Sequence, residues 1–252
     1  MSFDVAADAY GRFMGRFSRP LAVQFVELAE LHVGQRVLDV GCGPGALTAQ
    51  LVSRLGSASV SAIDPSVPFV AAIQNQFPRI DVRRGAAEEL PFDDAQFDCT
   101  LAQLVVHFMK DPVAGLSEMA RVTRPGGWVA ACVWDHGGGA GPLSTFWAAA
   151  HDLDPSVVGE ADLAGSREGD LARLFTEAGL KAIEPSRLTV TVGYATFEEW
   201  WEPYTLSVGV AGDYLAGLDP ERLDAVRARC RERLPDPPFD IHASAWCVRG
   251  RA

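Results

Sequence analysis

Three glycines at alternate positions are the residues of this sequence whose spacing points most directly to chemistry. They lie in Val-Leu-Asp-Val-Gly-Cys-Gly-Pro-Gly at 37–45, between an apolar run and a stretch with helical leucine spacing. Glycine permits positive φ in a tight turn, and its missing Cβ lets a ligand lie against the backbone. The helix that follows would offer unpaired N–H groups to a polar ligand. The pattern predicts that Gly41, Gly43 and Gly45 contact a cofactor.

Two classes of cofactor use such a turn, and the glycines alone do not separate them. Dinucleotide-binding proteins carry Gly-x-Gly-x-x-Gly/Ala, which Gly41, Gly43 and Ala46 satisfy. Asp39, however, stands where dinucleotide folds usually carry an apolar residue, and Gly45 adds a third glycine. These two residues favour a cofactor other than a dinucleotide, and an NAD(P)-dependent oxidoreductase is the weaker alternative.

The segments around this turn alternate between short apolar runs and helical patterns. Strands are expected at 36–41, 59–64, 81–85, 97–103 and 127–134, and helices at 45–56, 66–77 and 112–123. This alternation is typical of a mostly parallel sheet with helices on both faces, where ligands bind at the carboxyl ends of the strands. We therefore predict an α/β, Rossmann-like, doubly wound fold.

The regular alternation of short apolar runs and helical patterns ends at about residue 135. Further strands are expected at 188–194 and 241–250, which brings the sheet to seven strands, and further helices at 143–153, 166–180 and 220–234. The segments at about 136–165 and 195–218 have the character of insertions that form a helical lid or cap. We predict one domain over 1–252, with an N-terminal cover at about 1–30.

Four further motifs follow the glycine turn in order. They are Ser-Ala-Ile-Asp-Pro-Ser (61–66), Gly-Ala-Ala-Glu-Glu-Leu-Pro-Phe (85–92), the stretch that begins Phe-Asp-Cys-Thr-Leu-Ala-Gln (97–112), and a helix, Pro-Gly-Gly turn and strand (116–135). Together these motifs resemble the class I S-adenosylmethionine-dependent methyltransferases, in the methyltransferase type 11 branch with the ubiquinone- and menaquinone-biosynthesis-like enzymes. The resemblance covers about 37–135 and implies S-adenosylmethionine as cofactor and S-adenosylhomocysteine as product.

The resemblance also implies roles for the residues that match its motifs. Asp64 would accept both ribose hydroxyls, because a carboxylate only accepts hydrogen bonds; its structural alternative is a helix N-cap. Asp39 would order the glycine turn or reach the methionine ammonium group. The family usually carries an acidic residue at the position of Ala86, so the adenine amino group must find Glu88, a backbone carbonyl or water. The remaining expected cofactor contacts are Tyr10, Gly41, Gly43, Gly45, Pro65, Ala87 and Gln103.

The reaction implied is in-line methyl transfer to a small molecule, driven mainly by proximity and orientation. A base is needed only for a weakly acidic acceptor, and His107 and His151 are the candidates; the alternative is that each only shapes the pocket. Aromatic residues could line the acceptor pocket, although such residues more often form core. They are Trp134, Phe146, Trp147, Trp200, Trp201 and Tyr204.

The amino-acid composition excludes several classes of binding partner. The 252 residues include 33 acidic and 22 basic ones, a net charge of −11, which lacks the basic footprint that nucleic acid requires. The five cysteines show no Cys-x-x-Cys pair, so neither a disulfide framework nor a metal site is expected. No signal peptide or membrane span is indicated. We expect a cytoplasmic monomer or homodimer without nucleic-acid or membrane partners, and a non-catalytic S-adenosylmethionine-binding protein of this fold is the main alternative function.

Overall fold

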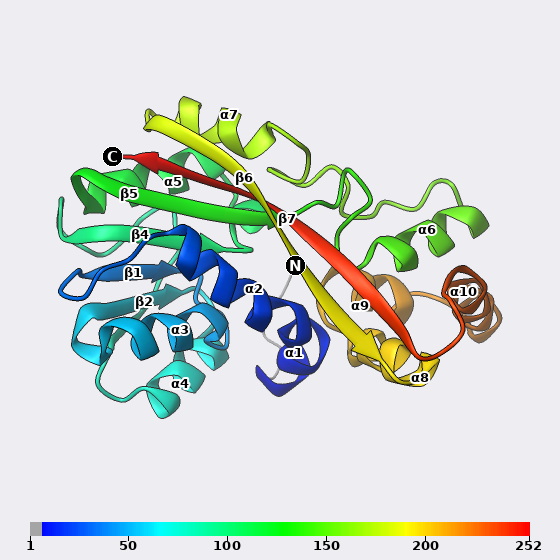
Figure 1. Ribbon diagram of the computed structural model, residues 1–252. Helices are drawn as coiled ribbons and strands as arrows, with labels where there is room; N and C mark the ends of the chain where they lie inside the picture. Colours follow the sequence, from blue (N-terminus) through cyan, green and yellow to red (C-terminus); the bar gives the residue numbers. More distant parts are fainter. Residues whose placement is uncertain (1–6) are drawn as a thin grey trace.

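One seven-stranded sheet runs through residues 7–252, the part of the chain that this computed structural model describes. The strand order is β3-β2-β1-β4-β5-β7-β6, and all pairs are parallel except those that β7 forms with β5 and β6 (Figure 1). The strands are β1 (Val37–Val40), β2 (Val60–Asp64), β3 (Asp81–Arg84), β4 (Phe97–Gln103), β5 (Thr123–Trp134), β6 (Lys181–Tyr194) and β7 (Phe239–Arg251). This sheet confirms the predicted doubly wound, Rossmann-like α/β fold.

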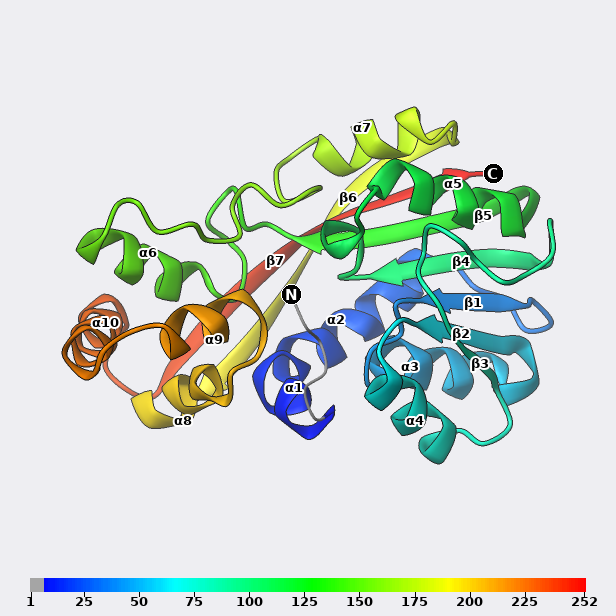
Figure 2. The same cartoon turned by 180° about the vertical axis from the view of Figure 1, so that it is seen from behind.

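Helices cover both faces of the sheet (Figures 1 and 2). Neighbouring residues of a strand point to opposite faces, so Val37 of β1 shares a core with Leu51 of α3, whereas Leu38 shares one with Leu116 of α5 and Phe175 of α7. The α-helices are α1 (Ala7–Phe13), α2 (Gly15–Leu28), α3 (Ala46–Leu55), α4 (Val67–Gln76), α5 (Pro112–Val122), α6 (Ser144–Leu153), α7 (Asp170–Glu177), α8 (Phe197–Trp201), α9 (Gly209–Ala216) and α10 (Pro220–Arg233). Three 3₁₀ helices are η1 (Ser57–Ser59), η2 (Val106–Phe108) and η3 (Glu202–Leu206).

The described residues also bear on metals, disulfides and membranes. All five cysteines are buried free thiols. Between residues 7 and 252, no three His, Cys, Asp or Glu side chains are grouped so that they could hold a metal ion. No helix in this part of the chain combines the length and the apolar character that crossing a membrane requires.

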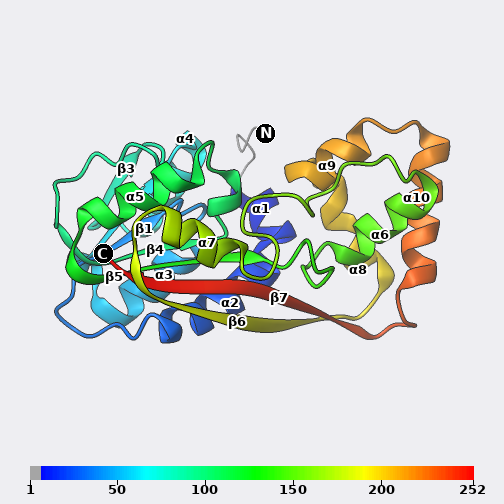
Figure 3. The ribbon, with the colours of Figure 1, turned by 90° about the horizontal axis from the view of Figure 1, so that it is seen from above.

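The strands β6 and β7 form a ribbon that extends beyond the sheet. β7 pairs with β5 only through Ala245–Arg251, whereas its first half pairs with β6 alone, up to Tyr194 opposite Phe239. Figure 3 shows the helices α6, α8, α9 and α10 gathered at the far end of this ribbon, away from the sheet body. We call these helices, residues 144–153 and 197–233, the cap.

The second segment of the cap extends beyond the insertion predicted at about 195–218. Helix α10 follows the predicted segment 195–218, yet it packs along α6 rather than on the sheet. Arg229 and Arg233 of α10 both donate to the Asp152 carboxylate of α6, with nitrogen–oxygen distances of 2.7 Å. The ring of Phe146 on α6 stacks on Tyr204 of η3, with the centroids 4.8 Å apart. An aromatic core and an ion-pair network therefore join both insertions into one unit.

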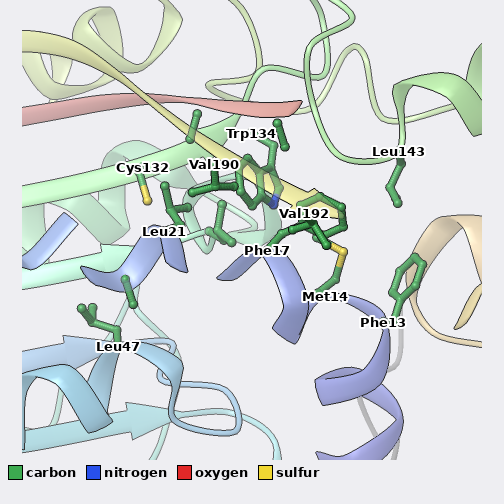
Figure 4. Packing of buried hydrophobic residues seen from close by; sticks show 14 of the residues in the cluster. Phe13, Met14, Phe17, Leu21, Leu47, Cys132, Trp134, Leu143, Val190 and Val192 are labelled. Atoms are coloured by element: carbon green, nitrogen blue, oxygen red, sulfur yellow. The ribbon is translucent and has the colours of Figure 1, made fainter. Parts of the chain in front are cut away.

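The N-terminal helices connect the sheet body to the ribbon. Phe17 of α2 packs edge to face on Trp134 of β5, with the ring centroids 6.3 Å apart, and both lie against Val190 and Val192 of β6 (Figure 4). The Gln103 side chain at the end of β4 donates to the Ser18 carbonyl of α2 at 2.9 Å. Helix α1 therefore lies between body and cap, at the place of the predicted N-terminal cover, whose residues 1–6 lie outside the described part of the chain.

Candidate active site

The glycine turn joins β1 to α3 at the carboxyl edge of the sheet. Its glycines all have positive φ: 69° at Gly41, 51° at Gly43 and 97° at Gly45. A Cβ on Gly41 would lie 2.4 Å from a methyl carbon of Val105, so no larger residue fits there without a shift. A Cβ on Gly43 would meet no described atom within 4 Å. Close packing therefore explains Gly41, whereas Gly43 borders open space that a ligand can fill.

Asp64 ends β2 beside this turn. One carboxylate oxygen accepts the backbone N–H of Gly43 and the other accepts that of Ser66, both at 2.8 Å. Ser66 is the residue before α4, so this bond corresponds to the structural alternative considered for Asp64, a cap at the start of that helix. Each carboxylate oxygen keeps a further lone pair, and Asp64 lines the cavity described below. Burial raises the pKa of Asp64, and the two backbone N–H groups oppose that change.

Asp39 lies deeper, under the turn. Its side chain is buried and accepts a hydrogen bond from the Thr48 hydroxyl of α3 at 2.6 Å. Burial raises the pKa of Asp39 to about 7, and the charge of Asp64 adds to the effect. Asp39 is not among the described residues that line the cavities. The geometry therefore favours the first of its two predicted roles, ordering of the turn.

This buried carboxyl makes a pH-dependent contribution to stability. The folded protein keeps a proton on Asp39 that the unfolded chain releases between about pH 4 and pH 7, so stability falls as the pH rises through this window. Asp39→Asn keeps an acceptor for Thr48 but does not ionise. We expect the free energy of unfolding of the natural protein, minus that of the variant, to fall by about 1 kcal/mol or more across the window. Urea unfolding at several pH values measures it, and a flat difference would contradict the prediction.

Three adjoining cavities follow the carboxyl edge of the sheet. We call them the outer cavity, the glycine-loop cavity and the inner chamber. In that order they enclose about 1120, 500 and 440 Å³ of empty space, open mouths included. Phe108 lines all three, and Tyr10 and Leu104 line both the glycine-loop cavity and the inner chamber. The outer cavity is lined by Gly41, Pro65, Gly85, Ala86, Ala87, Glu88, Glu89, Val105, Phe108, Met109, Lys110 and Asp111. The glycine-loop cavity is lined by Tyr10, Gly41, Gly43, Asp64, Pro65, Phe69, Gln103, Leu104, Val105 and Phe108. The inner chamber is lined by Tyr10, Phe13, Met14, Leu104, His107, Phe108, Trp134, His136, Leu143, Glu160, Val208, Gly209 and Val210.

Most of the residues predicted to bind a cofactor border the first two cavities. Ala86, Ala87 and Glu88 line the outer one. The Glu88 carboxylate accepts the backbone N–H of Lys110 at 2.7 Å, so it ties the two walls together. Gln103 lines the glycine-loop cavity, and within residues 7–252 its Oε1 is buried without a hydrogen-bond partner. Gly45, like Asp39, lies outside the lining and packs against α4.

Only some of the residues predicted to bind or activate an acceptor line the inner chamber. His107 and Trp134 line the inner chamber. His151 is exposed, and its Nδ1 donates to the Trp147 carbonyl of its own helix at 2.6 Å. The other predicted aromatics are buried in the hydrophobic core that the cap shares, and none is among the described lining residues. They are Phe146, Trp147, Trp200, Trp201 and Tyr204.

The inner chamber also contains residues that the sequence did not single out. Phe13 ends α1, Met14 lies between α1 and α2, Leu143 precedes α6, and Val208–Val210 belong to the cap. His136 follows the carboxyl end of β5, and this position next to a strand end could have identified it. Glu160 lies in a loop without any periodic pattern, so nothing in the sequence marked it.

Comparison with known proteins identifies a methyltransferase domain. Residues 38–131 match the family model described as a methyltransferase domain. A methyltransferase of uncharacterised activity from Mycobacterium tuberculosis is 37% identical over 127 residues, which are 50% of this chain and 49% of that protein. The chain thus spans about half the length of the curated relatives it matches.

Solved structures share the fold over most of the chain. A structure described as a candidate methyltransferase from Bacillus halodurans aligns with a TM-score of 0.59 at 17% identity, over 91% of this chain and 97% of that one. A phosphoethanolamine N-methyltransferase from Haemonchus contortus, solved with phosphomonomethylethanolamine and S-adenosylhomocysteine, gives 0.59 at 18% identity, over 99% and 57%. Residues 38–131 therefore carry a methyltransferase domain, and the chain as a whole has the fold of the class I methyltransferases.

Proposed function

We propose that this protein transfers the methyl group of S-adenosylmethionine to a small molecule in the inner chamber. The observation that carries the proposal is the series of three cavities whose neighbours share lining residues. The glycine turn and Asp64 border the middle cavity, and the apolar inner chamber shares Tyr10 and Leu104 with it. A cofactor that occupies the first two cavities would reach the wall of the third.

The residues present fit S-adenosylmethionine. Gly43 borders open space where a ligand can contact the backbone. Asp64 offers the remaining lone pairs of its carboxylate to the ribose hydroxyls. The unpartnered Gln103 Oε1 is an acceptor for the methionine ammonium group. The backbone of residues 85–88 borders the outer cavity, where the adenine would lie, although Ala86 has no polar side-chain group to bind it.

The cofactor, when bound, supplies a methyl group that a sulfonium already activates, so the protein's task is to align and enclose the reactants. Proximity and orientation of this kind are worth about 7–11 kcal/mol in favourable cases. Tyr10 and Phe108 border both the glycine-loop cavity and the inner chamber, where they would hold the two reactants in line. Helix α1 and Val208–Val210 close the chamber from the cap side, which supports their proposed role as a lid.

Calorimetric titration of the protein with S-adenosylhomocysteine tests the cofactor. We expect a single site, and no binding of NADH in a parallel titration. Incubation with labelled S-adenosylmethionine and a metabolite extract of the source organism then tests turnover, by identification of the labelled product. Binding of S-adenosylhomocysteine without any labelled small molecule would instead indicate a non-catalytic binding protein, and binding of NADH would contradict the proposal entirely.

A further inference from the structure

Unpaired polar atoms gather around the inner chamber. Six buried side-chain nitrogen or oxygen atoms between residues 7 and 252 have no hydrogen-bond partner. Three of them, His107 Nδ1, His136 Nε2 and Trp134 Nε1, belong to residues that line the chamber. Leaving a buried polar group unsatisfied costs about 1–3 kcal/mol, so such a group in a native structure calls for an explanation. A polar group on a ligand in the chamber would supply the missing partners.

His136 is the member of this group that also has a carboxylate beside it. Its Nδ1 lies 3.9 Å from Glu160 Oε2, and the two side chains are only 4% and 8% exposed. Trp147 Nε1 holds the same Glu160 oxygen at 2.8 Å. A carboxylate next to one imidazole nitrogen favours the proton there and leaves the other nitrogen as a base. At 3.9 Å this is an ion-pair distance, longer than a hydrogen bond, and such contacts often tighten only when the substrate is bound.

We propose that His136, oriented by Glu160, is the general base for an uncharged, apolar acceptor that is methylated on a hydroxyl group. This inference rests on the proposed function and adds to it the acceptor class and the catalytic residue. Glu160 acts through His136 and is a positioning residue. Its tie to Trp147 gives that residue, predicted as a pocket residue, an indirect role in the site.

The charges around the ring agree with this role. Burial lowers the pKa of His136 to about 4, and it holds the pKa of His107 well below its usual value, so both rings are neutral near pH 7. Asp135 at the end of β5 opposes the shift of His136, and Arg187 of β6 faces Asp135 at 3.2 Å. Glu160, Tyr10 of α1 and His107 of η2 complete the titratable groups of the chamber wall.

The proton and electron balance is closed without any further reactant. The hydroxyl proton moves to His136 Nε2 as an oxygen electron pair forms the new bond to the methyl carbon. The carbon–sulfur bond breaks, and its electron pair remains on sulfur, which becomes a neutral thioether. The imidazolium is stabilised by the adjacent Glu160 carboxylate and later releases its proton to solvent.

The chamber wall selects against anionic acceptors. Phe13, Met14, Leu104, Leu143 and the valines make most of it apolar, and its described residues include no lysine or arginine. A carboxylate or phosphate on the acceptor would lie near Glu160 with no cation to pair with, and burying an unpaired charge is strongly unfavourable. Trp134 Nε1, in contrast, can donate to an uncharged oxygen.

Phenols of graded acidity test the base. The probes are 4-methylphenol and the more acidic 4-nitrophenol, each with S-adenosylmethionine. We expect His136→Asn to lower the rate of methyl transfer to 4-methylphenol about 100-fold or more near pH 7, but to lower that to 4-nitrophenol much less, because an acidic hydroxyl needs less help. Glu160→Gln should give a smaller loss and move the acid limb of the pH–rate profile to lower pH.

Three controls keep the outcomes separate. His32→Asn changes an exposed histidine near the opposite end of β1 and should have no effect. Calorimetry should show unchanged S-adenosylhomocysteine affinity in His136→Asn, and weaker binding of 4-methylbenzoate than of 4-methylphenol to the natural protein. Equal losses for both phenols, a near-normal rate in His136→Asn, or a protein that binds S-adenosylhomocysteine but methylates neither phenol would overturn this inference alone. Absence of S-adenosylhomocysteine binding would overturn the proposed function instead.

Discussion

Replacement of Asp64 by alanine should weaken S-adenosylhomocysteine binding by about 100-fold or more. Two ribose hydroxyls would lose a charged acceptor, and hydrogen bonds to charged groups contribute about 1.5–3 kcal/mol each. The variant also removes the hydrogen bonds that Asp64 accepts from the backbone N–H groups of Gly43 and Ser66 at 2.8 Å, so the turn loses order as well. Isothermal titration calorimetry measures the affinity.

Two further variants separate ligand contact from loss of fold. Asp64→Asn keeps an acceptor oxygen without the charge, and we expect an intermediate loss. Asp236→Ala removes an exposed carboxylate near the far end of the ribbon, beyond the cavities, and should bind like the natural protein. Natural affinity in Asp64→Ala, with the melting temperature unchanged, would refute the assignment of the ribose site.

Phe146→Ala should lower the free energy of unfolding by about 3–5 kcal/mol, the usual range for a buried phenylalanine. The ring is fully buried and stacks on Tyr204 at 4.8 Å, with edge contacts to Trp147 at 5.0 Å and Tyr214 at 6.1 Å. A cavity in the middle of the cap would therefore weaken contacts between both of its segments. Urea unfolding, followed by tryptophan fluorescence, measures the change.

The same helix provides the matched control. Leu153 at the end of α6 is 48% exposed, and Leu153→Ala should change stability by less than about 0.5 kcal/mol. Phe146 is outside the described lining of the cavities, so Phe146→Ala should keep its affinity for S-adenosylhomocysteine below the unfolding transition. A loss of affinity together with normal stability would show that the residue contacts the ligand after all.

The sequence predicted the fold of the sheet body, and the grouping of Gly41, Gly43 and Asp64 at one edge, because both follow from local patterns. Buried parallel strands give uninterrupted apolar runs, and each run ends at the edge where Gly41, Gly43 and Asp64 come together. Strand β6 is longer than predicted because its first half, which includes Pro185, is polar. An edge strand tolerates such residues, since only one side of it is paired.

The residues predicted for the acceptor pocket do not all border one cavity, for a physical reason. An aromatic residue in a core and one in a pocket wall carry the same sequence signal. The sequence alone therefore could not distinguish Trp200 and Tyr204, which lie in the core, from Trp134, which lines the inner chamber. Glu160 reaches the chamber only through tertiary packing, from a loop that no periodicity describes. His136 could have been found by extending the strand-end argument from β1, β2 and β4 to β5.

The β6–β7 ribbon places the segment between β6 and β7 away from the sheet body, and this placement bears on how the protein could evolve new specificities. The chain leaves the ribbon at Tyr194 and returns at Phe239, which face each other in register. A segment with adjacent ends can be exchanged as a unit without a change in the rest of the backbone. The stretch between them contributes Val208, Gly209 and Val210 to the inner chamber but nothing to the described lining of the glycine-loop cavity. Under the proposed function, exchange of this stretch, with its packing on α6 retained, would be a route to new acceptors beside an unaltered glycine-loop cavity.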